Sequence, residues 1–308
     1  KCKKRARIIN CSRGGVVDEA ALAKALADGV IAGAACDVYS KEPPENSPLL
    51  SAPNIILTPH LGASTREAQL KVAVDVAEQV RDVLHGKPAL NAVNAVGFPP
   101  ELIAALGPYM ELAERLGSLH AQLLEGQLQE AEVVFSGDLA ETETMPLTTS
   151  FLQGLLGRSQ EEPVNMVNAR MVAESLGLKM KETKTSTTED YASLFSSRVK
   201  TDKGEHTVAG TLFGKKEGRI VSCDGYRMDF APSGPMLFTL HYDRPGVIGA
   251  VGSLLGAKKI NIAGMHVGRH SQGDVALMVL AVDSPIADPV IEEINALDNI
   301  ISSKLVEL

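Results

Sequence analysis

The first sixty residues alternate between short apolar segments and one helical segment. Helix is expected over Glu19–Asp28, because Asp18 can cap its free N–H groups and Gly29 can end it. The apolar segments on either side, which read as buried strands, are 6–10, 31–38 and 54–58. Strands that alternate with helices form parallel sheets covered by helices. We therefore predict a parallel α/β sheet, of which the chain carries only the last strands.

Two long helices are expected after this sheet. The first runs from about Thr65 to His85, with a capping box in which Ser64 is the N-cap and Glu67 reaches back to it. Residues 90–100 read as a linker, and the second helix ends near Glu125. One apolar stripe with spacings of three and four follows this second helix, formed by Leu112, Leu116, Leu119 and Leu123.

The pattern changes again in the last two thirds of the chain. Between about Glu130 and Phe230, polar-alternating strands are punctuated by glycines and joined to two short helices, which predicts an α+β domain. Met236–Leu308 reads strand–helix–strand–strand–helix–strand, the order of a ferredoxin-like fold. We predict an α/β and α+β multidomain protein, divided into 1–95, 96–232 and 233–308.

Composition excludes several classes of function. The net charge of −8 argues against non-specific nucleic-acid binding, and the chain lacks the run of about twenty apolar residues that a membrane helix needs. The cysteines form no CxxC pair and lie far apart, so we predict a reducing compartment, no disulfide framework and no metal. They are Cys2, Cys11, Cys36 and Cys223.

Three residues suited to hydroxy-acid oxidation each follow a predicted strand. His60 can titrate near neutral pH and take a hydroxyl proton, and a carboxylate such as Glu42 can hold and orient its ring. The guanidinium of Arg13 offers a planar, always-charged fork for a substrate carboxylate. Ligands of open parallel sheets bind at the carboxyl ends of the strands, so the three positions favour one shared site.

The motifs around these residues resemble the nucleotide-binding domain of D-isomer-specific 2-hydroxyacid dehydrogenases. They are NCSRGG at 10–15, DVYSKEP at 37–43 and LTPHLG at 57–62. The resemblance implies a partial Rossmann-like sheet, the cofactor NAD, and catalytic roles for Arg13, Glu42 and His60. It further implies cofactor contacts at Asp37, Cys11 and Gly62 as well as at Arg13 and His60.

The family's Gly-rich dinucleotide fingerprint is missing from the chain. Gly14-Gly15 follows no earlier glycine of that motif and does not open a helix directly. Without a pyrophosphate site, the chain by itself is not expected to hold NAD. We therefore interpret it as the C-terminal portion of a longer enzyme.

The last segment resembles an ACT domain, an amino-acid-sensing module. The motif HYDRPGVIG at 241–249 leads from a strand into a helix, and KINI at 259–262 opens the next strand. The resemblance implies that His241, Asp243 and Asn261 bind an L-serine effector, with aspartate at 243 where asparagine is commoner. The alternative is that this domain only dimerises.

Residues from about 97 to 230 resemble the intervening, allosteric substrate-binding domain of phosphoglycerate dehydrogenases. NMVNA at 165–169 and GTLFG at 210–214 carry this resemblance. Together the likenesses imply a homo-oligomeric enzyme of serine biosynthesis that oxidises 3-phosphoglycerate, located in the cytoplasm or, in a plant-like source, in the plastid. The alternative is a catalytically incomplete fragment that senses serine and oligomerises.

Overall fold

The structure is a computed structural model that describes the chain except for residues 1, 86–90, 92–99, 161, 189 and 215. It divides into two compact units, Lys1–Ala89 and Leu90–Leu308. The predicted linker at 90–100 and the predicted domain boundary after residue 95 fall almost entirely outside the described residues. The predicted boundary after residue 232 stays a prediction.

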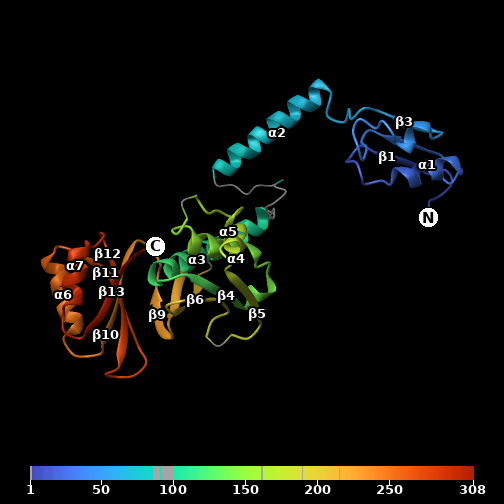
Figure 1. Ribbon diagram of the computed structural model, residues 1–308. Coiled ribbons are helices and arrows are strands. Elements are labelled where there is room, and N and C mark those ends of the chain that lie inside the picture. Colours follow the sequence, from blue (N-terminus) through green and yellow to red (C-terminus); the bar gives the residue numbers. More distant parts are fainter. Residues whose placement is uncertain (1, 86–90, 92–99, 161, 189, 215) are drawn as a thin grey trace. The chain divides into compact units, whose positions relative to one another are not determined.

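A three-stranded parallel sheet, in the order β1-β2-β3, is the centre of the first unit (Figure 1). Asp18 caps the helix between β1 and β2 by accepting a 3.0 Å hydrogen bond from the Ala21 N–H, as predicted. Leu22 and Leu26 of this helix are each 3% exposed and pack against the sheet. The elements are β1 (Arg7–Asn10), α1 (Glu19–Ala27), β2 (Gly33–Cys36), a 3-10 helix (Pro48–Ser51) and β3 (Ile55–Leu57).

Helix α2 (Arg66–Leu84) follows this sheet and buries none of its side chains. Its N-cap is Thr65, whose hydroxyl accepts a 3.2 Å hydrogen bond from the Ala68 N–H, so the predicted cap at Ser64 is wrong by one residue. The reason is local geometry: Thr65 takes the extended conformation that an N-cap needs, and the helix starts one residue later.

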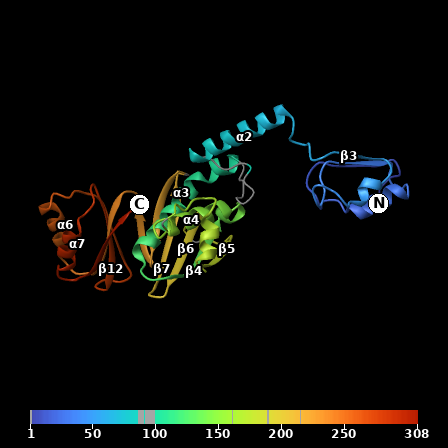
Figure 2. The same ribbon diagram turned by 45° about the horizontal axis from the view of Figure 1, so that its top comes forward.

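The second unit begins with helices that cover one face of a six-stranded sheet (Figure 2). The strand order is β5-β4-β6-β7-β8-β9, and only the pair β4–β5 is parallel. The sequence analysis missed β5 (Lys179–Thr185), because its lysines and threonines hide the apolar alternation of a strand. The other elements are α3 (Pro100–Leu123), β4 (Leu128–Gly137), a 3-10 helix (Asp138–Glu141), α4 (Met145–Leu156), α5 (Ala169–Ser175), β6 (Ser193–Thr201), β7 (Glu205–Phe213), β8 (Glu217–Cys223) and β9 (Tyr226–Phe230).

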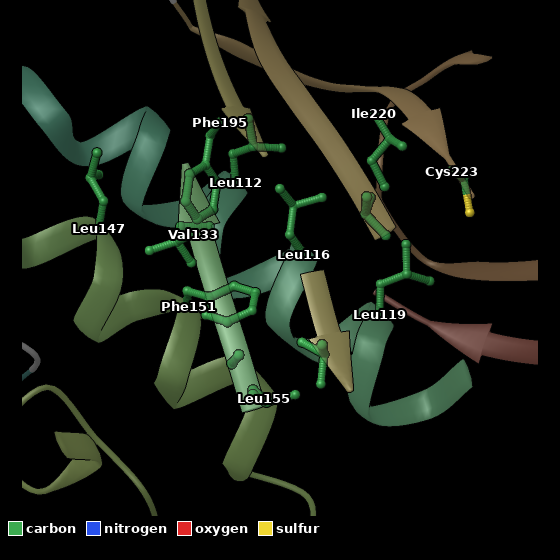
Figure 3. Close-up of a cluster of buried hydrophobic side chains, with 14 of the residues drawn as sticks. Leu112, Leu116, Leu119, Val133, Leu147, Phe151, Leu155, Phe195, Ile220 and Cys223 are labelled. Atoms are coloured by element: carbon green, nitrogen blue, oxygen red, sulfur yellow. The ribbon is translucent and has the colours of Figure 1, made fainter. Parts of the chain in front are cut away.

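The predicted leucine stripe of α3 lies in the core beneath these helices (Figure 3). Leu112, Leu116 and Leu119 are at most 1% exposed, whereas Leu123 at the end of the helix is only partly buried. Three phenylalanines of this core are at most 1% exposed, and two of them, Phe135 and Phe195, stack with ring centroids 5.1 Å apart. The third is Phe151.

Helices α3 and α4 cross so closely that only glycine fits at two positions. A Cβ atom on Gly117 would lie 2.1 Å from the Phe151 carbonyl oxygen, and one on Gly154 would lie 1.9 Å from the Glu114 carbonyl oxygen. Real Cβ atoms do not approach backbone this closely, so both glycines are needed for the helix packing.

The C-terminal segment has the predicted ferredoxin-like order, with an antiparallel sheet arranged β11-β12-β10-β13. One face of this sheet packs on the two helices of the segment through residues such as Leu255 and Ile294. Residues of the other face, among them Phe238 and Leu277, join the core of the six-stranded sheet. The elements are β10 (Pro235–Tyr242), α6 (Val247–Ala257), β11 (Ile262–Arg269), β12 (Val275–Val282), α7 (Asp288–Asn295) and β13 (Ile300–Glu307).

Among the described residues, no helix is both long enough and apolar enough to cross a membrane. The predicted α/β and α+β multidomain fold class is confirmed, because the parallel sheet, the mixed sheet and the ferredoxin-like sheet are all present.

Candidate functional site

The loops that follow the three parallel strands of the first unit meet at the carboxyl edge of the sheet. Arg13 follows β1, Glu42 follows β2 and His60 follows β3. Since the strands are parallel and adjacent, their carboxyl ends lie side by side. The sheet therefore holds the three predicted catalytic residues on one edge.

His60 and Glu42 are in direct contact. The His60 Nδ1 lies 2.7 Å from Glu42 Oε2, and the other carboxylate oxygen of Glu42 accepts a 3.1 Å hydrogen bond from the Tyr39 N–H. The hydrogen bond with His60 lowers the pKa of Glu42, and the Tyr39 amide adds to this effect. Because a carboxylate can only accept, Nδ1 carries the proton and the Nε2 of His60 is the ring atom available to a ligand.

The Asp37 carboxylate holds the turn that carries His60 in place by accepting three hydrogen bonds. Its Oδ1 accepts hydrogen bonds from the Thr58 hydroxyl at 2.6 Å and from the Leu61 N–H at 2.7 Å, and its Oδ2 accepts one from the Gly62 N–H at 2.8 Å. His60 has φ +56°, in the left-handed region, so its backbone needs such support. The predicted cofactor contact of Asp37 and Gly62 stays a prediction. The structure shows a structural role for both residues, which is to hold the turn that carries His60 in shape.

These hydrogen bonds make the turn sensitive to acid. The Thr58 hydroxyl, followed by the Leu61 amide, lowers the pKa of Asp37 below its ordinary 3.8. A lowered carboxyl pKa contributes stability that is present above about pH 3.8 and is lost as the pH falls through the folded-state value. We expect the Leu61 and Gly62 amides to be protected from hydrogen exchange at neutral pH and to lose protection in that acid range.

Asp37→Asn tests this expectation, because asparagine offers one acceptor oxygen where aspartate offers two. At neutral pH the Leu61 amide, the Gly62 amide or both should exchange hydrogen faster in the variant than in wild type, as measured for individual amides in NMR spectra. The Thr58 N–H donates to the Cys36 carbonyl and serves as the control. Equal protection of all three amides in the variant and in the wild type would show that the Asp37 carboxylate does not hold this turn in place.

Arg13 lies on a turn that Asn10 shapes. The buried Asn10 side chain accepts from the Ser12 N–H at 3.2 Å and donates to the Arg13 carbonyl at 3.3 Å. A Cβ on Gly14 would lie 1.9 Å from the Tyr39 carbonyl oxygen, so glycine lets this turn approach the loop that carries Glu42. The Arg13 side chain is exposed and donates to the Ser12 carbonyl at 2.7 Å. Cys11 of the same turn is exposed as well.

Sequence reasoning missed the residues that support this edge. The Tyr39 hydroxyl lies 3.0 Å from the Cys36 carbonyl oxygen and 2.9 Å from the Thr58 carbonyl oxygen, and its one hydrogen is shared between them, which ties β2 to the end of β3. Ser40 N donates to Glu19 of helix α1 at 2.6 Å. The one available signal for this support was the tyrosine two residues after Asp37. The sequence does not show which carbonyl groups the tyrosine hydroxyl contacts.

The predicted effector residues lie at the ends of β10 and β11 in the second unit. His241 is 1% exposed, with Nδ1 2.9 Å from the Tyr242 carbonyl oxygen, while its buried Nε2 has no hydrogen-bond partner among the described residues. Asn261 is exposed and donates to Asp283 at 2.7 Å. An unpartnered buried nitrogen is costly, which makes the His241 ring the most unusual polar group of this region.

Asp243 is held by a residue at the end of strand β11. Arg269 Nη1 donates to Asp243 Oδ2 at 2.8 Å, and the Gly273 N–H donates to the same oxygen at 3.2 Å. The Arg269 hydrogen bond, followed by that of Gly273, lowers the pKa of Asp243. Arg269 is therefore the residue that fixes the orientation of Asp243.

An open parallel sheet with a histidine–glutamate pair at its carboxyl edge, followed in the same chain by a ferredoxin-like sheet, places the chain in the class of multidomain α/β and α+β proteins whose ligands bind at that edge. Comparison with known families agrees with this class. Residues 1–62 match the D-isomer specific 2-hydroxyacid dehydrogenase, NAD binding domain, and residues 105–224 match the D-3-phosphoglycerate dehydrogenase intervening domain. Residues 236–299 match the ACT domain.

Curated relatives match along the length of the chain. D-3-phosphoglycerate dehydrogenase of Synechocystis is 46% identical over 309 residues, which cover 100% of this chain and 56% of the relative. The Bacillus subtilis protein of the same name is 40% identical, with coverage of 100% and 59%. D-3-phosphoglycerate dehydrogenase 2, chloroplastic, of Arabidopsis thaliana is 36% identical, with coverage of 97% and 51%.

The chain belongs to the D-isomer specific 2-hydroxyacid dehydrogenase family, in its phosphoglycerate dehydrogenase branch, and this confirms the resemblance seen in the sequence motifs. The chain spans between 51% and 59% of the length of the three relatives.

Proposed function

We propose that the chain supplies the catalytic residues of an NAD-dependent D-3-phosphoglycerate dehydrogenase, which oxidises 3-phospho-D-glycerate to 3-phosphohydroxypyruvate in L-serine biosynthesis. The observation that carries this proposal is the 2.7 Å contact between His60 Nδ1 and Glu42 Oε2 at the carboxyl edge of a parallel sheet. The proposed substrate is taken from the names of the relatives, both of which are D-3-phosphoglycerate dehydrogenases.

The roles of the three residues follow from their chemistry. His60 Nε2 takes the proton of the substrate hydroxyl as the carbonyl forms, and Glu42 stabilises the imidazolium that results. Glu42 can do so without moving, because the Tyr39 amide already holds its second oxygen. The exposed guanidinium of Arg13 binds the substrate carboxylate in a bidentate manner and orients the hydroxyl toward His60.

The residues of this edge fit the nicotinamide end of NAD. The cofactor, when bound, accepts the hydride that leaves the substrate carbon. Asp37 Oδ2 accepts one hydrogen bond, from Gly62, and keeps acceptor capacity for a carboxamide N–H. Cys11 lies exposed on the turn before Arg13, where it can line the same place. The sequence has no G-x-G-x-x-G motif, so this chain's own residues do not provide the usual pyrophosphate site.

The test is a dehydrogenase assay on a chimera that restores the length of the relatives. The chain is joined to the part of the Synechocystis protein that it does not span, and NADH formation is followed with 3-phosphoglycerate. Activity that depends on 3-phosphoglycerate supports the proposal. A folded chimera that oxidises other 2-hydroxy acids but leaves 3-phosphoglycerate unchanged would overturn the substrate assignment and keep the family.

A second proposal concerns the C-terminal segment, for which we infer L-serine binding by His241, Asp243 and Asn261. The observation that favours it is the buried His241 Nε2, which has no partner among the described residues and which a bound polar ligand would satisfy. Gly246, with φ +96°, is the N-cap of helix α6 and provides no side-chain cap. The Val247 N–H donates to the Arg244 carbonyl at 3.4 Å, and the amides that follow it can face a carboxylate.

Calorimetric titration of the chain with L-serine tests this second proposal. We expect saturable binding by wild type and a loss of roughly tenfold or more in affinity in Asn261→Ala, because the deleted amide is a direct polar contact of the ligand. Asn295→Ala, at the end of helix α7, is the matched control. Absence of heat with wild type would leave the alternative that this segment only oligomerises.

We further propose a homo-oligomer with three domains at 1–95, 96–232 and 233–308. The ACT match supports regulation by an amino acid in such an assembly. The chloroplastic name of the Arabidopsis relative is in keeping with a plastid location for a plant-like source, and a cytoplasmic location is proposed otherwise.

A further inference from the structure

Three metal-binding side chains converge at the hairpin between β8 and β9, outside the sites described above. The Cys223 Sγ lies 3.6 Å from His206 Nε2, and Asp224 Oδ2 lies 3.1 Å from the same nitrogen. All three donor atoms are within 4.8 Å of one another. His206 and Cys223 are 7% and 1% exposed, so two of the three groups are removed from water.

The hairpin itself holds Asp224 in place. Asp224 and Gly225 have φ +47° and +78° and form a two-residue turn between the paired residues Cys223 and Tyr226. The Thr207 N–H donates to Asp224 Oδ1 at 2.8 Å, which leaves Oδ2 directed at His206. The carboxylate is therefore preorganised by the backbone of two strands.

A chain of buried hydrogen bonds sets the proton positions on His206. The Ser197 hydroxyl donates its one hydrogen to the Val208 carbonyl at 3.2 Å, so it can only accept from His120 Nε2 at 2.9 Å. His120 is 0% exposed and neutral, which leaves its Nδ1 as an acceptor. His206 Nδ1, at 3.1 Å from that atom, must then carry the hydrogen.

The consequence is a lone pair on His206 Nε2 that faces the carboxylate of Asp224. Two acceptors at 3.1 Å repel each other unless a positive charge lies between them. A metal ion between them supplies such a charge and also contacts the Cys223 sulfur, which lies 3.6 Å from His206 Nε2.

Two of the three separations between the ligand atoms are close to those of a four-coordinate metal. Bonds of about 2.0–2.3 Å at the tetrahedral angle place neighbouring ligand atoms roughly 3.3–3.8 Å apart. The sulfur–nitrogen separation of 3.6 Å falls in this range, and the nitrogen–oxygen separation of 3.1 Å is slightly below it. A cavity of about 500 Å³ borders all three residues and leaves room for a fourth, exchangeable ligand. Besides Asp224, its charged lining residues are Glu125 and Lys304.

We propose that His206, Cys223 and Asp224 bind one thiophilic divalent cation of the Zn²⁺ type, with an open coordination position toward the cavity between the six-stranded sheet and the C-terminal sheet. His120 and Ser197 are positioning residues, since they fix the tautomer and the ring orientation of His206 in the manner of outer-shell partners at metal sites. The spacing of the residues in the sequence, 206, 223 and 224, follows no zinc motif, which is why sequence analysis predicts no metal.

The test is a titration of the reduced, chelator-treated chain, free of any histidine tag, with Co²⁺ and then with Zn²⁺. We expect one Co²⁺ per chain, with a thiolate-to-cobalt charge-transfer band and the visible bands of four-coordinate cobalt, both removed by Zn²⁺. Cys223→Ser should abolish the charge-transfer band, while Cys2→Ser, which changes an exposed cysteine, should keep it. No stoichiometric binding, or a band that survives Cys223→Ser, would overturn the proposal.

A second variant guards against a folding defect in Cys223→Ser. Asp224→Asn changes a half-exposed turn residue and keeps an oxygen for the Thr207 amide. It should bind Co²⁺ at least roughly tenfold more weakly, because loss of even an outer-shell partner costs 10- to 100-fold in affinity. Unchanged affinity in this variant, with its circular dichroism as in wild type, would exclude Asp224 as a ligand and refute the three-residue site.

Ser197→Ala tests the hydrogen-bond chain separately. We expect the same charge-transfer band at saturation but roughly 10- to 100-fold weaker metal affinity, because His120 and then His206 lose the fixed direction of their protons. A merely structural role of Ser197 would change the stability of the chain without changing the affinity, and that result would contradict the positioning role.

Discussion

His60→Gln is expected to lower the turnover of the chimera on 3-phosphoglycerate by roughly 10²- to 10⁴-fold, because the variant removes the group that takes the hydroxyl proton. Glutamine fills similar space and can still hydrogen-bond to Glu42, so the edge of the sheet should stay folded. The fall should appear in kcat and in kcat/KM alike, since proton transfer takes place only in the transition state. Steady-state kinetics with 3-phosphoglycerate and NAD measure both constants.

Variants of the two partner residues separate their roles. Arg13→Lys should mainly raise KM, because lysine cannot hold a carboxylate with two parallel hydrogen bonds. Glu42→Gln should lower kcat, since a neutral amide no longer stabilises the imidazolium next to it. Lys41→Ala, at an exposed neighbour of Glu42, is the control and should leave both constants unchanged. If His60→Gln kept a tenth or more of the turnover, His60 would not be the acid–base residue.

Gly154→Ala is expected to destabilise the second unit by about 1–3 kcal/mol, the range seen when a methyl group is forced into a packed interior. The new Cβ would start 1.9 Å from the Glu114 carbonyl oxygen, so helices α3 and α4 must move apart to admit it. Leu116, Leu119 and Phe151 lie at this helix pair and would lose contacts in the process (Figure 3). Urea denaturation followed by circular dichroism measures the change.

Gly252→Ala provides a control with the opposite sign. Gly252 lies inside helix α6, and a Cβ at this position meets nothing within 4 Å. Alanine is a better helix former than glycine by about 1 kcal/mol, so this variant should be slightly more stable than wild type. Equal effects of the two substitutions would show that helix propensity, and not the close crossing, determines the outcome at Gly154.

Local signals in the sequence were sufficient for the framework of the catalytic edge. Arg13, Glu42 and His60 each follow a short apolar strand, and parallel strands place their carboxyl ends together whatever the rest of the chain does. The order of the C-terminal strands and helices followed in the same way from apolar periodicity. The cap of α2 was displaced by one residue, because Ser64 and Thr65 are both good N-caps and only the backbone angles choose between them.

Contacts between distant residues were beyond the sequence. Asp37 reaches Thr58, Leu61 and Gly62 only because β2 and β3 are neighbours in the sheet. The pair Asp243–Arg269 joins the ends of two strands, and its members are 26 residues apart in the sequence.

The sequence by itself determined the family and the fold class and supplied candidate residues for the chemistry, because these depend on short motifs and on periodicities of two and 3.6 residues. Only the tertiary structure decided which side chains support those residues, and only it brought His206, Cys223 and Asp224 together. The physical reason is that hydrogen bonds and metal ligation act over about 3 Å in space. Which residues come that close depends on strand register and helix packing across the whole unit, and no local pattern encodes that.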